Sequence, residues 1–129
     1  MTALDAGLKY RGLALEGEYY WRAVTNLRGP GTDGLPFSDL RDNGFQLQAS
    51  AMVVPKTLQA FVLGSKINGQ FGDPWDMRIG ANWFPWQNQI VRWHTEYAYF
   101  RRSPVGALSL PMVVGANGPV LFSDFMISF

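Results

Sequence analysis

Residues 13–24 read LALEGEYYWRAV, and apolar and polar side chains alternate along this stretch. One parity is apolar, and the other carries the charges of Glu16, Glu18 and Arg22. Successive side chains of a β-strand point to opposite faces of its sheet, whereas an α-helix repeats about every 3.6 residues. The stretch is therefore predicted to be a β-strand with one apolar face and one charged face.

The same alternation recurs along the chain. It is as clear in three further stretches, at residues 44–53, 75–84 and 90–101. It is weaker in another three, at residues 3–10, 57–66 and 120–129. In residues 57–66 both parities hold apolar side chains, so the facing of that strand stays open, and in the last stretch Phe122 and Met126 break the pattern. Seven strands and no helix are predicted, which makes the fold all-β, antiparallel and up-and-down.

The composition excludes several classes of protein. The chain has 129 residues, with 11 Lys and Arg against 10 Asp and Glu, one His and no Cys. The length allows one domain, residues 1–129. The absence of cysteine excludes disulfides, thiolate zinc sites and cysteine nucleophiles. The near-neutral charge gives no electrostatic basis for binding nucleic acid. No apolar run approaches the roughly 18 residues of a membrane-spanning helix.

The connections between the predicted strands alternate between short and long. The long ones are rich in Gly, Pro and Asp, as in residues 28–34 and 115–119. In an up-and-down sheet this alternation places all long loops at one end, as in outer-membrane barrels. Most segments also reach the roughly 9–11 residues that a tilted strand needs to cross the bilayer. We therefore expect a transmembrane β-barrel, in which residues 103–119 fold inward as a constriction or pack against a neighbour.

In such a barrel one parity faces membrane lipid and the other faces a water-filled lumen. Aromatic side chains of the apolar parity are expected in the girdles at the headgroups: Tyr19, Trp21, Trp75, Trp83, Trp93, Tyr97 and Tyr99. The opposite parity is expected to line the pore, with Glu16, Glu18, Arg22, Asp76, Arg78, Arg92, His94 and Glu96. The expected location is the bacterial outer membrane.

No catalytic residue, metal site or cofactor is predicted, and the chain is not expected to be an enzyme. His94 has no second imidazole to share a metal ion. Glu16 and Glu18 lie on one face as in a glycosidase, but carboxylates paired with neighbouring arginines are much commoner in a lumen. The glycines at 29, 31 and 34 lack the Lys and Ser/Thr of a phosphate-binding loop, so they are expected in an external loop.

Two features resemble known outer-membrane proteins. Phe125, Ile127 and Phe129 are similar to the terminal signal that the outer-membrane assembly machinery reads, although Asp124 replaces its usual glycine. Residues 8–22 (LKYRGLALEGEYYWR), 54–61 (VPKTLQAF) and 79–85 (IGANWFP) resemble, in order and spacing, the end of the phosphate-selective porin family, the porin O and P type.

The resemblance implies the C-terminal part of a large trimeric barrel in the outer membrane of Gram-negative bacteria, through which solutes diffuse passively. This chain departs from the family because its lumen arginines are interleaved with carboxylates instead of forming an arginine ladder. Phosphate selectivity is therefore not expected.

Two functions from different classes remain. The first is a porin for ion transport and for diffusion of small polar or anionic solutes, in which fixed charges of both signs set the field across the lumen. The alternative is a soluble all-β binding module that offers an aromatic sheet face to a carbohydrate or protein partner. Because bacterial single-chain barrels have even strand numbers, seven strands imply a miscounted strand, several combined copies, or further strands outside this chain.

Overall fold

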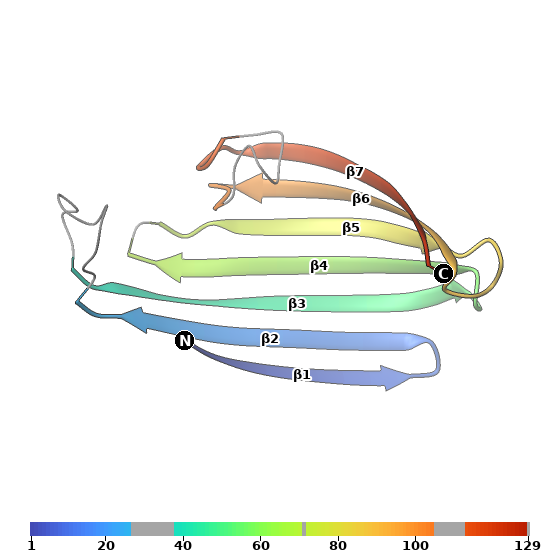
Figure 1. Cartoon of the computed structure of the whole chain (residues 1–129), viewed down its shortest axis with the longest axis horizontal. Coiled ribbons are helices and arrows are strands. Elements are labelled where there is room, and N and C mark those ends of the chain that lie inside the picture. The colour runs from blue at the N-terminus through green and yellow to red at the C-terminus, as the bar shows by residue number, and fades with distance from the viewer. Residues whose placement is uncertain (27–37, 71, 105–112, 129) are drawn as a thin grey trace.

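The computed structural model describes residues 1–26, 38–70, 72–104 and 113–128. In these ranges the chain forms one antiparallel sheet of seven strands and no helix, so the all-β, up-and-down prediction is confirmed (Figure 1). The strands are β1 (Thr2–Tyr10), β2 (Leu13–Val24), β3 (Leu40–Val54), β4 (Leu58–Gly69), β5 (Trp75–Trp83), β6 (Val91–Arg101) and β7 (Gly118–Ile127). No helix within those ranges is long and apolar enough to cross a membrane.

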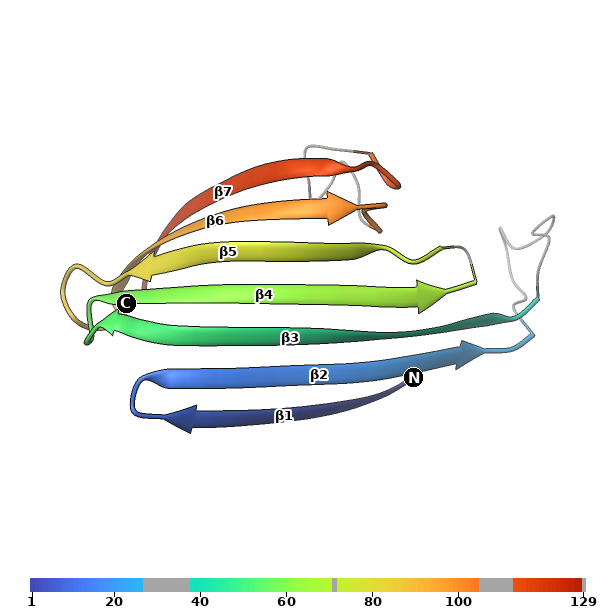
Figure 2. The same ribbon diagram turned by 180° about the vertical axis from the view of Figure 1, so that it is seen from behind.

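Each strand pairs only with its neighbours in sequence, and the spatial order is β1 to β7. β1 and β7 lie at opposite edges, so the sheet is open (Figures 1 and 2). The first hairpin closes through Arg11 and Gly12, whose φ angles are 46° and 83°. Two successive positive φ angles are typical of a type I′ turn, which matches the twist of the flanking strands.

The expected alternation of short and long connections was wrong at one place, because the fourth connection was expected to be long and the fifth to be short. The connection between β4 and β5 spans residues 70–74, whereas that between β5 and β6 spans residues 84–90 and lies at the end expected to carry short turns. Strand pairing explains the difference, because β4 continues to Gly69 and a bridge from Gly69 to Gly72 shortens the next connection. The longest connections, residues 25–39 and 102–117, still lie at one end of the sheet.

β3 begins at Leu40, four residues before the start predicted from alternation. Its first residues pair with the end of β2, with Asp42 opposite Arg22 and Leu40 opposite Val24. β7 also begins earlier than predicted, at Gly118, and ends at Ile127. These ends depend on pairing with a neighbouring strand, which the alternation of a single segment does not report.

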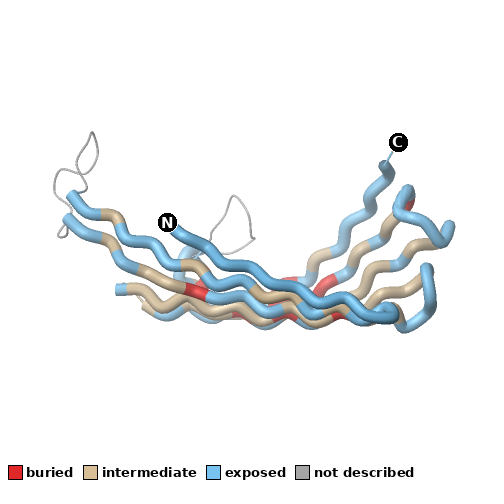
Figure 3. Tube along the Cα trace, turned by 90° about the horizontal axis from the view of Figure 1, so that it is seen from below, coloured by how far each residue is buried: buried red, intermediate tan, exposed pale blue. Residues whose placement is uncertain are grey.

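Burial separates the two parities of the sheet. The polar parity contains nearly all buried strand residues, which are Gly44, Ser50, Phe61, Leu63, Asp76, Glu96, Ala98, Phe100 and Val120. The apolar parity is exposed even in the middle of the sheet, where Ile79 of β5 is 62% exposed. The sheet is curved (Figure 3), and side chains converge on the inside of a curve. We therefore assign the polar parity to the concave face and the apolar parity to the convex face.

The facing of β4, left open by its sequence, follows from its register. Val62 pairs with Ala49 and Ile79 on the convex face, so Phe61 and Leu63 lie on the concave face. In β7, Phe122 is likewise concave and packs against a small apolar cluster of Ala98, Phe100 and Val120. The concave face thus combines polar and charged side chains with an apolar cluster on β6 and β7 and with Phe61 and Leu63 of β4.

Phe61 lies over the bare backbone of Gly80, its partner on β5. A Cβ atom on Gly80 would lie 2.5 Å from Phe61 Cζ and 2.5 Å from the backbone oxygen of Thr95. The ring of Phe61 also stacks on His94, with centroids 5.4 Å apart and planes 13° apart. A glycine at position 80 is therefore what allows Phe61 to lie flat and support His94.

Candidate functional site

A row of polar side chains crosses the concave face from β3 to β6. Gln59, Asn82 and His94 are direct neighbours on three adjacent strands. His94 Nδ1 lies 2.8 Å from Asn82 Oδ1, Asn82 Nδ2 donates to Gln59 Oε1 at 3.0 Å, and Gln59 Nε2 donates to Ser50 Oγ at 3.2 Å. Because the Asn82 oxygen can only accept, His94 Nδ1 carries the proton of that bond. The row therefore has a fixed direction of hydrogen bonding.

Four of the predicted pore-lining residues form one charged cluster next to this row. Arg78 bridges two carboxylates, since its Nε bonds Asp76 and its Nη1 lies 3.5 Å from Glu96 Oε1. His94 Nε2 lies 3.7 Å from Glu96 Oε2. Asp76 and Glu96 are buried, and Ser65 donates a further hydrogen bond to Asp76. Carboxylates taken out of water need such partners, because an unpaired buried charge is costly.

The remaining predicted pore-lining residues lie on the same face but apart from the cluster. Arg22 holds Asp42 through two nitrogens, with Nε 3.1 Å from Asp42 Oδ2. Glu16 Oε1 lies 2.8 Å from Lys9 Nζ. Glu18 forms no ion pair with any residue that the structure describes. The eight residues thus share a face, as predicted, but only Asp76, Arg78, His94 and Glu96 meet.

Arg92 is the second residue of β6 and lies on the concave face at the short-turn end of the sheet. Its Nε atom is buried and has no hydrogen-bond partner in the described parts of the chain. It borders a mixed pocket of about 510 Å³ that is also lined by Gln59, Asn82 and Ser128. The pocket offers several hydrogen-bonding groups to a polar occupant.

The residues that pair with the predicted pore-lining side chains were not found from the sequence. Asp42 was placed in a loop, because the alternation was followed only from Gly44, although Asp42 has the same parity as Gln46 and Gln48. Gln59 and Asn82 are uncharged and were not singled out, and only the register shows that they lie beside His94. Extending the alternation by two residues could have found Asp42.

The seven predicted girdle aromatics all lie on the convex face, at different heights. Trp83 and Trp93 pair directly at the short-turn end, and Trp93 meets the edge of Phe125 at 6.4 Å between ring centroids. The opposite end carries Tyr19 and Trp21, with centroids 6.3 Å apart, and also Trp75, which is 5.8 Å from Tyr99. Tyr97 departs from the expected strand-end position, because it lies mid-sheet between Ile79 and Leu121.

The predicted assembly signal is only partly described. Phe125 and Ile127 both lie on the convex face and are exposed, at 58% and 55%. Phe129 lies outside the described residues, as do residues 105–112 of the predicted constriction segment and the glycines at 29, 31 and 34.

The concave face offers fixed charges and hydrogen-bonding groups on its described strands. Within the described ranges, no three His, Cys, Asp or Glu side chains lie so as to hold a metal ion. The His94 ring has the Glu96 carboxylate on one side and the Asn82 amide on the other. No protein-family model, no curated protein and no solved structure matches the chain.

Proposed function

We propose that the chain forms part of the wall of an outer-membrane porin, through which small polar or anionic solutes diffuse passively. One observation carries the proposal: the apolar parity of the sheet is exposed, whereas nearly all of the buried strand residues belong to the polar parity. Met77 and Ile79 in the centre of the sheet are 57% and 62% exposed, whereas Asp76 beside them is 8% exposed. A sheet wall between lipid and a water-filled lumen has this distribution.

A sheet in water distributes its side chains in the opposite way. An antiparallel sheet of a soluble domain packs its apolar face on a core and leaves its polar face solvated. The convex face here exposes large apolar side chains on every strand, and contiguous apolar patches beyond a few hundred Å² are rare on soluble monomers. Membrane lipid satisfies this face directly, whereas the soluble binding module would need a partner covering all seven strands.

The open edges set a condition on the proposal. β1 pairs only with β2, and β7 only with β6, so each edge strand leaves one row of backbone groups unpaired within the described ranges. Each unpaired backbone group in hydrocarbon costs several kcal/mol, so a spanning sheet must close. The proposed barrel is therefore completed by strands additional to these seven, either from a larger porin of which this is the C-terminal part or from further copies.

The charged groups of the concave face would set the selectivity of the lumen. Rings and clusters of charged side chains govern which ions pass a pore. Arg78 is held between Asp76 and Glu96, and Arg22 is held by Asp42, so positive and negative charges are interleaved. This arrangement supports weak selectivity among small polar solutes and does not support a phosphate-selective pore.

The resemblance to the phosphate-selective porin family extends the proposal to assembly. We propose that the partners of the chain are further copies of itself, in a trimer, and the outer-membrane assembly machinery that inserts it. The exposed convex positions of Phe125 and Ile127 leave both side chains accessible to a partner.

Reconstitution of the purified chain tests the proposal. The chain is mixed with phosphatidylcholine vesicles, flotation in a density gradient measures partition, and planar bilayers under a salt gradient measure current and reversal potential. We expect flotation, and step-like currents where copies of the chain close into a barrel. A chain that stays monomeric in detergent-free buffer and melts cooperatively there would overturn the proposal and favour the soluble binding module.

Two matched variants test which face lines the lumen. Glu18 and Gln46 are direct neighbours on β2 and β3, and both lie on the concave face. Glu18→Gln removes one negative charge and Gln46→Glu adds one, so we expect their reversal potentials to shift in opposite directions. Unchanged potentials in both variants would contradict a lumen lined by this face.

A further inference from the structure

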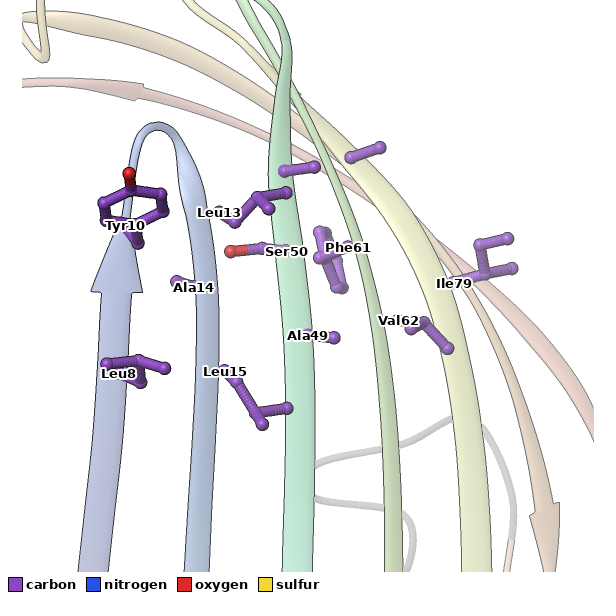
Figure 4. A pocket seen from close by; sticks show the side chains of 12 residues that line it. Leu8, Tyr10, Leu13, Ala14, Leu15, Ala49, Ser50, Phe61, Val62 and Ile79 are labelled. Carbon is purple, nitrogen blue, oxygen red and sulfur yellow. The ribbon is translucent and has the colours of Figure 1, made fainter.

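A groove of about 670 Å³ indents the convex face near the short-turn end of β1 to β5 (Figure 4). Small side chains on β3 and β4 line its centre, namely Ala49, Ala51 and Ala60. Leu13 and Leu15 of β2 stand on one side, and Val62 stands on the other (Figure 4). The groove is thus an apolar depression within an already apolar surface, and its volume suits a flexible hydrocarbon chain.

A cation lies at the rim of this groove. Tyr10 lines the groove, and the guanidinium carbon of Arg11 lies 5.2 Å from the centroid of its ring. Arg11 is exposed and forms no ion pair with the described part of the chain. Its turn is anchored to β3, because the amide of Met52 donates to the Gly12 oxygen at 2.8 Å. The charge is therefore held next to the apolar groove.

The turn between β3 and β4 carries a second cation. Lys56 is exposed, has a φ angle of 60°, and likewise forms no ion pair with the described residues. Successive strands run in opposite directions, so the β1–β2 and β3–β4 turns, which carry the two cations, lie at the same end of the sheet. Two positive charges with no ion pair in the described ranges thus lie at the end of the sheet nearest to the groove.

We propose that this groove and Arg11 form a binding site for a phospholipid with an anionic headgroup. One acyl chain occupies the groove, and the headgroup phosphate lies at the guanidinium of Arg11, with Lys56 adding to the positive potential. The inference rests on the proposed function, because it requires the convex face to lie in a bilayer. It goes further in naming one lipid class and one location on that face.

Charge favours a lipid over a second copy of the chain as the occupant. Among the strand residues of the convex face the charged side chains are all cationic, at Arg41, Lys66 and Arg101. A second copy that packed through its own convex strand face would bring no carboxylate to Arg11. An anionic phospholipid supplies the negative charge and the apolar chain in one molecule.

The expected preference follows from the charge. One Lys or Arg near an anionic lipid surface contributes an attraction that corresponds to about a fivefold change in affinity. We therefore expect the chain to retain phosphatidylglycerol about fivefold over phosphatidylcholine through Arg11, with a smaller further gain from Lys56.

The experiment uses the full chain in vesicles of equimolar phosphatidylglycerol and phosphatidylcholine. After transfer to mild detergent, native mass spectrometry counts the lipids that stay bound. Arg11→Gln should reduce the preference about fivefold, and Arg11→Lys should largely keep it. Ala60→Leu fills the groove and should lower the bound phosphatidylglycerol, whereas Ala23→Leu, at the other end of the convex face, should not.

Failure of this inference can be told apart from failure of the proposed function. If the chain floats with vesicles but retains both lipids equally, or if Ala60→Leu binds as much phosphatidylglycerol as the native chain, the lipid site is refuted and the porin proposal stands. A lipid-free dimer that Ala60→Leu disrupts would instead identify a second copy as the occupant. If the chain does not enter vesicles at all, both proposals fail.

Discussion

The exposed apolar side chain in the middle of the sheet allows a direct test of the environment of the convex face. Ile79 is the middle residue of β5, pairs with Val62 and Tyr97, and is 62% exposed. Ile79→Arg therefore places a guanidinium on the convex face at mid-strand. No carboxylate occupies the convex parity of the neighbouring strands, so the new charge gains no ion pair there.

The two environments predict different costs. On the lipid face of a membrane barrel, an arginine at the bilayer midplane lowers the free energy of unfolding by about 2–4 kcal/mol. On a solvated surface, a substitution with no special contacts changes it by no more than about 0.5 kcal/mol. The smallest loss of unfolding free energy expected in lipid exceeds the largest change expected in water, so one variant distinguishes the two environments.

The assay is urea unfolding of the chain in phosphatidylcholine vesicles, followed by tryptophan fluorescence. Ile90→Arg is the matched control, because Ile90 is 47% exposed, lies in the connection after β5 and lines a pocket with Arg92 away from the convex face, so that the substitution should cost no more than about 0.5 kcal/mol. We expect a large loss for Ile79→Arg and a small one for Ile90→Arg. Equal and small effects would show that the convex face does not contact lipid, and the reasoning would be wrong.

Three further predictions concern the backbone and the charged cluster. Gly80→Ala should lower the free energy of unfolding by about 1–3 kcal/mol in the same assay, because its Cβ meets a ring and a backbone oxygen at 2.5 Å. Gly64→Ala, whose nearest atom would be 3.9 Å away, should be close to neutral, and equal losses would refute the packing argument. Gly12→Ala should cost about 1–2 kcal/mol because φ is 83° there, and an unchanged urea midpoint would contradict this. Glu96→Gln removes a carboxylate from Arg78 and should shift the reversal potential toward anions, whereas a shift toward cations would exclude a lumen role for Glu96.

Most of the fold could be predicted from the sequence, because alternation is a local property. β2 was predicted residue by residue, and six other segments were predicted with ends that differ by a few residues. The errors lie where pairing between strands overrides the local pattern. The early start of β3 depends on Arg22 opposite Asp42, and the short connection after β4 depends on the bridge between Gly69 and Gly72.

The candidate site was predictable as a face but not as a set of contacts. Parity alone assigned Asp76, Arg78, His94 and Glu96 to one side of the sheet, and the structure places them there. Their contacts depend on which residues of adjacent strands stand opposite each other. Shifting one strand by a single residue would move its side chains to the other face, so a missing register leaves all partners unknown.

The sequence by itself determined that this chain forms a sheet with one apolar and one charged face, because the two-residue period of a strand is written in the order of its side chains. Only the tertiary structure decided which face is buried. The curvature of the sheet brings the charged side chains together on its concave side and leaves side chains such as Ile79 and Leu121 exposed on the convex side. Curvature arises from all seven strands together, so no single segment of the sequence contains it.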